Sequence, residues 1–223
     1  MNQFRRLMFV VLLSGALAGL VLFVVQNVTV IPLIEKAEAY ETAAHPHAEE
    51  GWQPAQGWER TSLTALGTIL SGIGFAAMLF GSMALSGAPV STRRSALWGL
   101  GAFACFGLAP ALGLPPQPPG VAVASLYERQ LWWVGTAIAT AFGLWLLFGR
   151  GRTWLLRIGG LVCLVLPHVI GAPVATGENA VPAQLIRQFT IASLASTGVF
   201  WLLLGTIGGW MYGWRSGDAN ELP

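Results

Sequence analysis

Long apolar stretches alternate with shorter polar segments along the whole chain. Six apolar stretches can be separated, and they cover residues 6–33, 61–86, 95–112, 126–148, 154–172 and 187–213. A helix needs about 20 apolar residues to cross the hydrocarbon core of a bilayer. Helices are required there because lipid offers no hydrogen-bond partners to the backbone. The pattern therefore predicts an all-α, polytopic membrane helix bundle with six transmembrane helices, in one domain spanning residues 1–223.

The polar segments on the two predicted sides of the membrane differ in length and composition. On one side they are short and basic. On the other side, an outer loop covers residues 35–59, a proline-rich loop covers 113–124 and a third covers 173–184. The second of these is expected to be stiff, because proline fixes φ and favours extended backbone. Residues 214–223 are predicted to form a C-terminal cytoplasmic tail.

Charge gives the orientation of the predicted bundle. Charged residues make up only 10% of the chain, whereas a soluble domain carries about 25%. The basic residues that would share one side are Arg5, Arg6, Arg93, Arg94, Arg150, Arg152, Arg157 and Arg215. Because cytoplasmic loops are rich in Lys and Arg, this pattern predicts an N-in, C-in topology. Most carboxylates, from Glu35 to Glu178, then fall on the outer face, which is expected to be acidic.

The first apolar stretch also resembles a signal peptide. However, its apolar run over residues 7–25 is longer than the roughly 7–15 residues of a signal-peptide core, and it continues into further apolar sequence. We interpret it as a retained membrane helix, with cleavage as the alternative.

Small residues at four-residue spacing predict close helix packing, because they let two backbones approach. They form three sets: Gly15 with Gly19, Gly135 with Ala139 and Gly143, and Gly205 with Gly209.

A weak internal repeat is also present. Cys105, Pro110 and Gly113 precede Arg129-Gln130, and Cys163, Pro167 and Gly171 precede Arg187-Gln188. This similarity favours three repeated hairpins around an axis normal to the membrane, as in repeat-built transporters. Chance similarity among segments rich in Gly, Pro and Leu is the alternative.

The outer loop carries the first group of candidate metal ligands. If the first helix continues past Pro32, then Glu35, Glu38 and Glu41 share one stripe of it. His45 and His47 follow on either side of a proline. Carboxylate oxygen and imidazole nitrogen together suit first-row divalent metals. The alternative interpretation is a solvated acidic loop with two incidental histidines.

His168 is the second candidate, near the outer end of the fifth stretch. An ionisable group at membrane depth is costly and suggests a functional site. The preceding Pro167 leaves a backbone carbonyl unsatisfied one turn earlier, which favours ion coordination nearby. We expect His168, with Glu35 or Glu128, to pass a metal ion into the bundle. The alternative is a histidine that is hydrogen-bonded to a neighbouring helix.

Several functions are excluded by the sequence. Lys36 is the only lysine and no phosphate-binding loop is present, so ATP hydrolysis at such a loop is excluded. No Ser/His/Asp set is apparent, so we expect no enzymatic activity. A single histidine in the membrane stretches excludes bis-histidine haem, and we expect no bound cofactor. Cys105 and Cys163 are expected to pack as small apolar residues. Without blocks of positive charge, nucleic acid is not an expected partner.

Four strings together resemble the CbtA family over nearly the whole chain. They are the loop from Gly113 to Gly120, Arg129-Gln130-Leu131-Trp132-Trp133, the run from Pro167 to Pro173, and the run from Phe200 to Gly205. The opening, with Pro32-Leu33-Ile34-Glu35 and then Tyr40-Glu41, is also similar.

That family is described as a predicted cobalt transporter subunit of bacteria. The resemblance implies Co²⁺ as the transported ion, passage across the bacterial inner membrane, and support of cobalamin synthesis. It also implies a small single-span partner, CbtB, with a histidine-rich tail. Glu35, Glu38, Glu41, Arg129, Gln130 and His168 match family motif positions, whereas His45 and His47 lie in a variable segment.

Two functions therefore remain as hypotheses. The first is a membrane subunit that moves divalent metal through the lipid bilayer. The second is a non-transporting scaffold or assembly subunit that binds a small partner protein. Polar residues in the apolar stretches are few, which favours a partner or a homo-oligomer for the first hypothesis.

Overall fold

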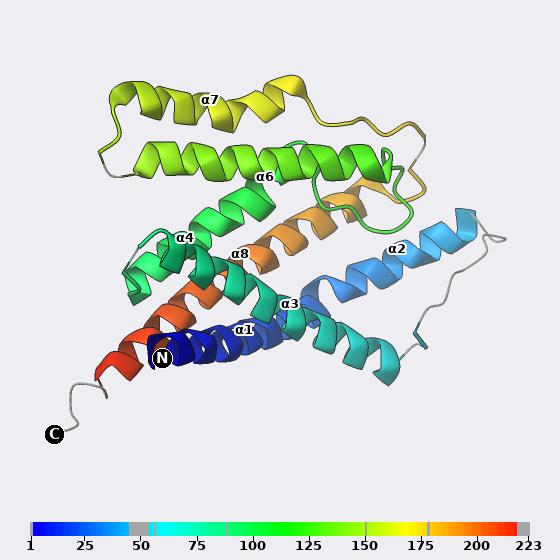
Figure 1. Cartoon of the computed structure of the whole chain (residues 1–223). Helices are drawn as coiled ribbons and strands as arrows, with labels where there is room; N and C mark the ends of the chain where they lie inside the picture. Colours follow the sequence, from blue (N-terminus) through cyan, green and yellow to red (C-terminus); the bar gives the residue numbers. More distant parts are fainter. Residues whose placement is uncertain are drawn as a thin grey trace. The chain divides into compact units, whose positions relative to one another are not determined.

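A computed structural model describes residues 2–44, 54–55, 57–87, 89–149, 151–177 and 179–217, and their regular elements are all helical. This confirms the all-α class. In chain order the elements are α1 (Asn2–Thr29), α2 (Ile31–Ala44), α3 (Trp58–Leu85), α4 (Thr92–Phe103), η1 (Ala104–Leu108), α5 (Ala109–Ala111), α6 (Leu126–Phe148), α7 (Trp154–Ile170) and α8 (Ala183–Gly217) (Figure 1).

Each predicted apolar stretch coincides with a helical segment. Four segments are long and apolar enough to cross a membrane, namely Gln3–Thr29, Trp58–Leu85, Leu126–Phe148 and Ala183–Trp214. Helix α7 is apolar but has only 17 residues, and α4, η1 and α5 follow one another as a continuous helical run over residues 92–111. The length and apolar composition of these helices therefore indicate a multi-pass membrane protein.

Two boundaries differ from the predicted ones. The predicted outer loop 35–59 begins as a helix, because α2 continues to Ala44. Pro32 explains the separation of α2 from α1, since it has no N–H to donate to the carbonyl of Val28, and proline is tolerated in a first helical turn. The predicted tail at 214–223 begins inside α8, which ends at Gly217. His45 and His47 lie outside the described residues.

The chain divides into two units. Unit 1 contains Met1–Val28, His47–Leu100 and Ser196–Pro223, and unit 2 contains Thr29–Pro46 and Gly101–Ala195. Helices α4 and α8 contribute residues to both units, and each unit is described by itself below.

Close helix crossings at glycine hold unit 1 together. A Cβ on Gly15 of α1 would lie 2.6 Å from Ile73 Cα of α3, and one on Gly19 would lie 2.8 Å from Thr68 O. Likewise, a Cβ on Gly209 of α8 would lie 2.8 Å from Thr92 Cα of α4. The predicted glycine faces of the first and last helices are thereby confirmed, because these backbones pack without intervening side chains.

Large side chains fill the remaining space in unit 1. Phe80 and Met83 of α3 and Trp201 and Leu204 of α8 are fully or almost fully buried. Phe75 adds a ring contact to Trp201 at 5.1 Å between centroids. Aromatic rings thus supply much of the packing area between these helices.

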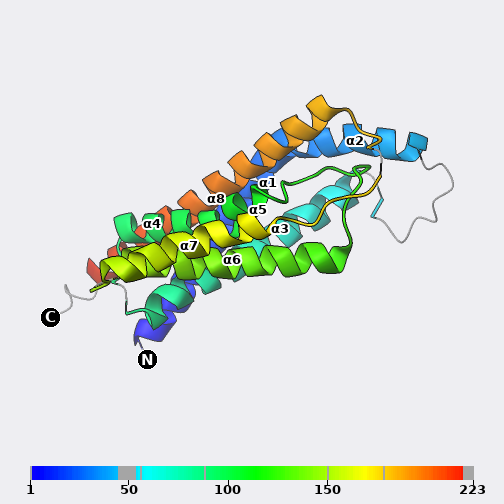
Figure 2. The ribbon, with the colours of Figure 1, turned by 90° about the horizontal axis from the view of Figure 1, so that it is seen from above.

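In unit 2, α6 and α7 lie side by side and antiparallel (Figures 1 and 2). Gly143 and Gly160 face each other, and a Cβ on either would lie 2.8 Å from the other's carbonyl oxygen. The prediction for Gly135 was wrong, because a Cβ there would meet nothing within 4 Å. Of the two glycines in that set, only Gly143 therefore lies against another helix backbone.

A wide helical turn precedes the outer end of the third stretch. Residues Ala104–Leu108 form the π-helical turn η1, and Pro110 is buried just beyond it. In a regular α-helix the ring of Pro110 would clash with the carbonyl of Phe106, and a π turn relieves that clash. The helix can therefore continue to Ala111 before the proline-rich loop begins.

Candidate functional site

Basic residues of unit 1 gather at one end of its helices. The guanidinium of Arg6, near the start of α1, donates to the carbonyl oxygen of Tyr212 near the end of α8 and lies 3.7 Å from its ring centroid. Arg93 and Arg94 lie in the first turn of α4, and the first residue of that helix, Thr92, packs against Gly209 of α8. Glu59, by contrast, lies in the first turn of α3, at the other end of its crossing with α1.

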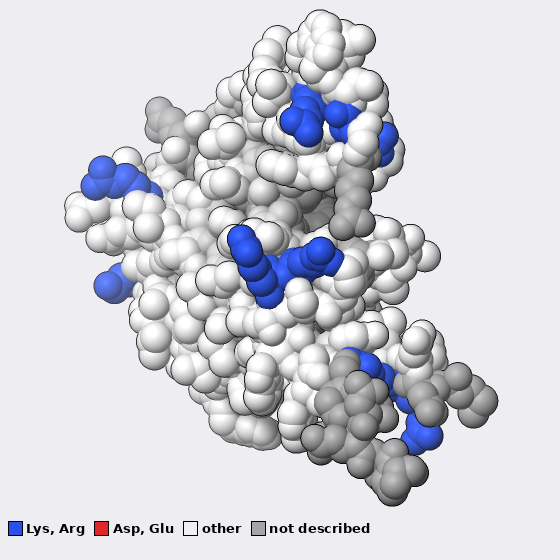
Figure 3. Space-filling view, turned by 90° about the vertical axis from the view of Figure 1, so that its left-hand side faces the viewer, with Lys and Arg blue, Asp and Glu red and all other residues white. Residues whose placement is uncertain are grey.

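Unit 2 also has a basic end, whereas its other end carries both signs of charge, since Arg129 follows Glu128. Arg152 precedes α7, and its guanidinium lies 3.6 Å from the ring centroid of Trp145 in the last turn of α6. Glu128 lies in the first turn of α6, and the antiparallel pairing places the C-terminal end of α7 beside it. On the face drawn in Figure 3, the coloured side chains of the described residues are Lys or Arg only.

Helix α2 covers the polar end of unit 2. Its Ala37 is fully buried against Val181 and Leu185, and Leu33 packs against the same cluster. Two loops meet there as well. The amide of Ala180 donates to Gly120 O at 3.3 Å, and the amide of Ala122 donates to Asn179 Oδ1 at 3.1 Å. The proline-rich loop and the loop after α7 therefore form one layer with α2.

The three glutamates of α2 take different positions around this contact. Glu35 and Glu41 are exposed, and Glu38 is half-buried. Gly120 approaches the backbone of Glu41 closely, since a Cβ on Gly120 would lie 3.1 Å from the Cβ of Glu41, and its φ of 77° suits glycine. The expected acidic stripe is thus helical and lies against the proline-rich loop at its Glu41 end.

Glu128 takes part in the cap of α6. Its Oε2 accepts a hydrogen bond from Ser125 Oγ at 2.8 Å, and its amide donates back to Ser125 Oγ at 3.3 Å. This reciprocal pair is a form of capping box, and a carboxylate is stabilised at a helix N-terminus. Glu128 therefore has a structural role in addition to any role as a ligand.

His168 lies in the last turn of α7, beside the second turn of α6. Its half-buried ring makes an edge contact with Trp132 at 6.0 Å between centroids. The indole Nε1 of Trp132 donates to Pro167 O at 3.3 Å, and this carbonyl also accepts from the amide of Gly171 at 3.1 Å. Glu128 lies one turn before Trp132 on α6, so both project from the same side of that helix.

The structure brings the candidates to one end of unit 2 without joining them in a closed site. Among the residues it describes, no three His, Cys, Asp or Glu side chains form a group that could hold a metal ion. The ligand assignments of Glu35, Glu38, Glu41, Glu128 and His168 stay predictions, and those of His45 and His47 fall outside the described residues.

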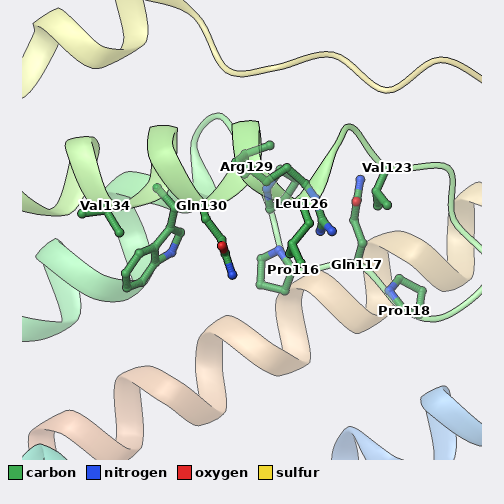
Figure 4. A pocket seen from close by; sticks show the side chains of 11 residues that line it. Pro116, Gln117, Pro118, Val123, Leu126, Arg129, Gln130 and Val134 are labelled. Atoms are coloured by element: carbon green, nitrogen blue, oxygen red, sulfur yellow. The ribbon is translucent and has the colours of Figure 1, made fainter. Parts of the chain in front are cut away.

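A cavity of about 570 Å³ opens at the same end of unit 2 (Figure 4). The proline-rich loop forms one wall with Pro116, Gln117 and Pro118. Helix α6 forms the other wall, where Arg129 and Gln130 are the polar members. Thr190 Oγ1 of α8 donates to Pro116 O at 2.8 Å and so fixes the loop wall.

The sequence did not predict this cavity, nor the π turn before it. Two sequence features later proved to line it, namely the prolines of the loop and Arg129-Gln130 of α6. The spacing of these residues does not show that the loop folds back over the start of α6. That fold depends on the hydrogen bond from Thr190 of α8 to Pro116 O and on the close approach of Gly113 to Trp132. A Cβ on Gly113 would overlap the indole of Trp132, so any larger residue there would have to displace that ring.

These features define the class: a multi-pass, all-helical membrane protein with polar groups at the ends of its helices. The chain belongs to the CbtA family, described as a probable cobalt transporter subunit, whose model matches residues 4–213. No curated protein and no solved structure gives a match to the chain.

Proposed function

We propose that this protein is the membrane-embedded subunit that moves Co²⁺, or a similar divalent cation, across the bacterial inner membrane. The match to the CbtA family over residues 4–213 carries this proposal. Because a family of transporter subunits is not a class of enzymes, catalysis of a chemical reaction forms no part of it.

Capture begins at the acidic end of unit 2. Glu35 and Glu41 are exposed on α2, and a cluster of like charges raises the local concentration of cations. Their carboxylates are spread along the helix and reach solvent. Dispersed oxygen ligands suit an ion that must bind and also leave, as conduction requires.

His168 is the next ligand in the proposed route. Its ring is positioned by Trp132, whose indole is in turn fixed by Pro167 O. This packing limits the orientations that the imidazole can take. Glu128 lies at the same end of α6 and is the carboxylate we assign beside His168.

Orientation is part of the proposal. We assign six spans, counting α7 and the run from α4 to α5 with the four long helices, and place both termini in the cytoplasm. In each unit, one helix end has arginines and no carboxylates among the described residues, and this supports the topology. Cation entry would then follow the membrane potential, which is worth about 2.3 kcal/mol per charge per 100 mV.

A partner completes the route. The word "subunit" in the family description supports at least one further component. Following the resemblance, we assign a small single-span protein similar to CbtB, with assembly of several copies as the other arrangement.

One observation favours a second function, that of a non-transporting scaffold. Several hydroxyls in the spans bond to their own helices: Thr68 Oγ1 donates to Thr64 O at 2.8 Å, and Thr136 Oγ1 donates to Trp132 O at 2.8 Å. Hydroxyls used in this way offer little to a passing ion. A scaffold would instead use its helix surfaces to hold the partner.

Uptake of radioactive Co²⁺ separates the two functions. Cells that express the chain with its partner are compared with cells that express either alone, and with cells that carry His168→Ala at equal membrane levels. A transporting subunit predicts uptake that needs the chain and is lost in the variant. Equal uptake by the variant and the wild type would favour the scaffold.

A further inference from the structure

The cavity at the start of α6 is lined by both polar and apolar side chains. Gln117 of the loop and Arg129 and Gln130 of α6 supply the polar groups, whereas Leu126, Trp133 and Val134 supply apolar surface. Figure 4 shows Pro116, Pro118 and Val123 along the opposite side of the space. The cavity therefore has the amphipathic lining that a ligand with a polar head and an apolar tail requires.

Arg129 is the cation of this cavity. It is half-buried, and its Nε is buried without a hydrogen-bond partner among the described residues. A buried guanidinium nitrogen without an acceptor is costly, and an acceptor on a ligand that reaches this guanidinium would reduce that cost. The carboxylate of the neighbouring Glu128 accepts from Ser125 Oγ, at the cap of the helix.

The apolar side chains of Trp133 and Val134 lie on a helix that is long enough to span a membrane. Trp133 and Val134 lie one turn farther along α6 than Arg129 and Gln130, and α6 belongs to the four long apolar helices. Val134 is also exposed at the surface of the unit. A ligand whose head contacts Arg129 could therefore extend an acyl chain past Val134 into surrounding lipid.

From these features, we propose that the cavity is a binding site for a phospholipid, with the lipid phosphate on Arg129 and Gln130 and an acyl chain along Trp133 and Val134. Arginine pairs with phosphate through parallel N–H donors, and the Gln130 amide adds a further donor. The site would fix the proline-rich loop against α6. It goes beyond the proposed metal route and depends only on insertion of the chain in a membrane.

Native mass spectrometry of the purified full chain tests this proposal. Delipidated protein is titrated with phosphatidylglycerol, with diacylglycerol and with sodium phosphate. Arg129→Gln should weaken phosphatidylglycerol binding about tenfold, as expected for loss of a charge-assisted contact, and Arg129→Lys should retain most of it. Diacylglycerol should bind as weakly to the wild type as phosphatidylglycerol does to Arg129→Gln, because it lacks the phosphate.

Arg187→Gln is the matched control. Arg187 also precedes a glutamine near the start of its helix, but it is exposed and does not line the cavity. Equal loss of lipid in Arg187→Gln and Arg129→Gln would overturn the site, as would equal binding of diacylglycerol and phosphatidylglycerol to the wild type. Displacement of phosphatidylglycerol by millimolar phosphate would overturn the role of the acyl chain. If Arg129→Gln does not fold, the comparison of phosphatidylglycerol with diacylglycerol on the wild type and on Arg129→Lys still tests whether the site needs the lipid phosphate.

Discussion

At the scale of single residues, two glycines of α6 show that the neighbouring helix decides whether a glycine allows close packing. Gly143 faces α7 so closely that a Cβ would lie 2.8 Å from Gly160 O, whereas a Cβ on Gly135 would meet nothing within 4 Å. Both glycines lie in an apolar helix at equivalent spacing, and only the neighbour differs. The contribution of each therefore follows from the structure of unit 2 and not from the helix alone.

We expect Gly143→Val to destabilise the protein by about 1–3 kcal/mol, because the added side chain must push the α6 and α7 backbones apart. Gly135→Val should leave stability nearly unchanged. Unfolding curves in mixed micelles of mild detergent and dodecyl sulfate measure both variants. Equal destabilisation of the two would show that the pairing of α6 with α7 is misplaced.

His168 is the residue on which the proposed metal route depends most. Its edge contact with Trp132 also gives it a packing role, so removal of the ring alone cannot separate the two roles. A substitution that keeps polarity and much of the volume is needed.

His168→Gln should lower Co²⁺ uptake by about tenfold or more, since an amide is a poor ligand for a first-row metal. Uptake by cells with matched amounts of membrane protein provides the measurement. Trp132→Phe is the companion variant, because it keeps an aromatic ring beside His168 but removes the donor to Pro167 O. It should reduce uptake less than His168→Gln does. Normal uptake by His168→Gln would reduce His168 to a packing residue.

At the scale of elements, α2 is the segment whose observed structure differs most from the sequence prediction. It is a helix held by the buried face of Ala37 on Val181 and Leu185. Its glutamates lie around the remainder of the helix, so their charge can change without loss of that contact. The element therefore allows charge and fold to be tested separately.

We expect the triple variant of Glu35, Glu38 and Glu41 to glutamine to bind Co²⁺ about tenfold more weakly, because the acidic surface no longer concentrates cations. Isothermal titration at low ionic strength provides the affinity. Glu59→Gln is the control, since this carboxylate begins α3 in the other unit. An unchanged affinity in the triple variant, with a helical spectrum like that of the wild type, would contradict a role for α2 in capture.

At the scale of the whole molecule, the distribution of charge is the main feature. Among the described residues, each unit has one helix end with arginines and no carboxylates, whereas at the other end glutamates lie beside arginines such as Arg60 in unit 1 and Arg129 in unit 2. Because basic loops are retained in the cytoplasm, the loop before α4 is predicted to lie inside and the loop after α7 outside. The orientation can be measured without any assay of transport.

We predict that Thr176→Cys reacts with a membrane-impermeant maleimide in intact spheroplasts, and that Ser91→Cys reacts only after permeabilisation. Both positions are exposed, in the loop after α7 and before α4 respectively. The background chain has Cys105 and Cys163 replaced by alanine. Labelling of Ser91→Cys from outside would reverse the proposed topology.

The sequence by itself determined the helical class and the approximate extent of the six apolar helical segments, but not that of α2, most of which it assigned to a loop. Apolar stretches of this length have one stable backbone form in lipid, so their pattern is enough. The CbtA strings, such as Pro167 to Pro173, also pointed to the family that the comparison then showed. The glycine faces of α1 and α8 were predictable for a similar reason, because only small residues let helix backbones touch.

The tertiary structure alone decided which glycine of α6 makes a contact, how α2 packs against the start of α8, and where a cavity opens. These features depend on residues far apart in the chain, such as Thr190 with Pro116 and Ala37 with Val181. Local hydrophobic pattern carries no information about which partner a side chain meets. The candidate ligands were therefore named from the sequence. Their separation from one another was set only by the packing of α6, α7 and the proline-rich loop. The same packing placed Trp132 beside His168, and the cap of α6 paired Glu128 with Ser125.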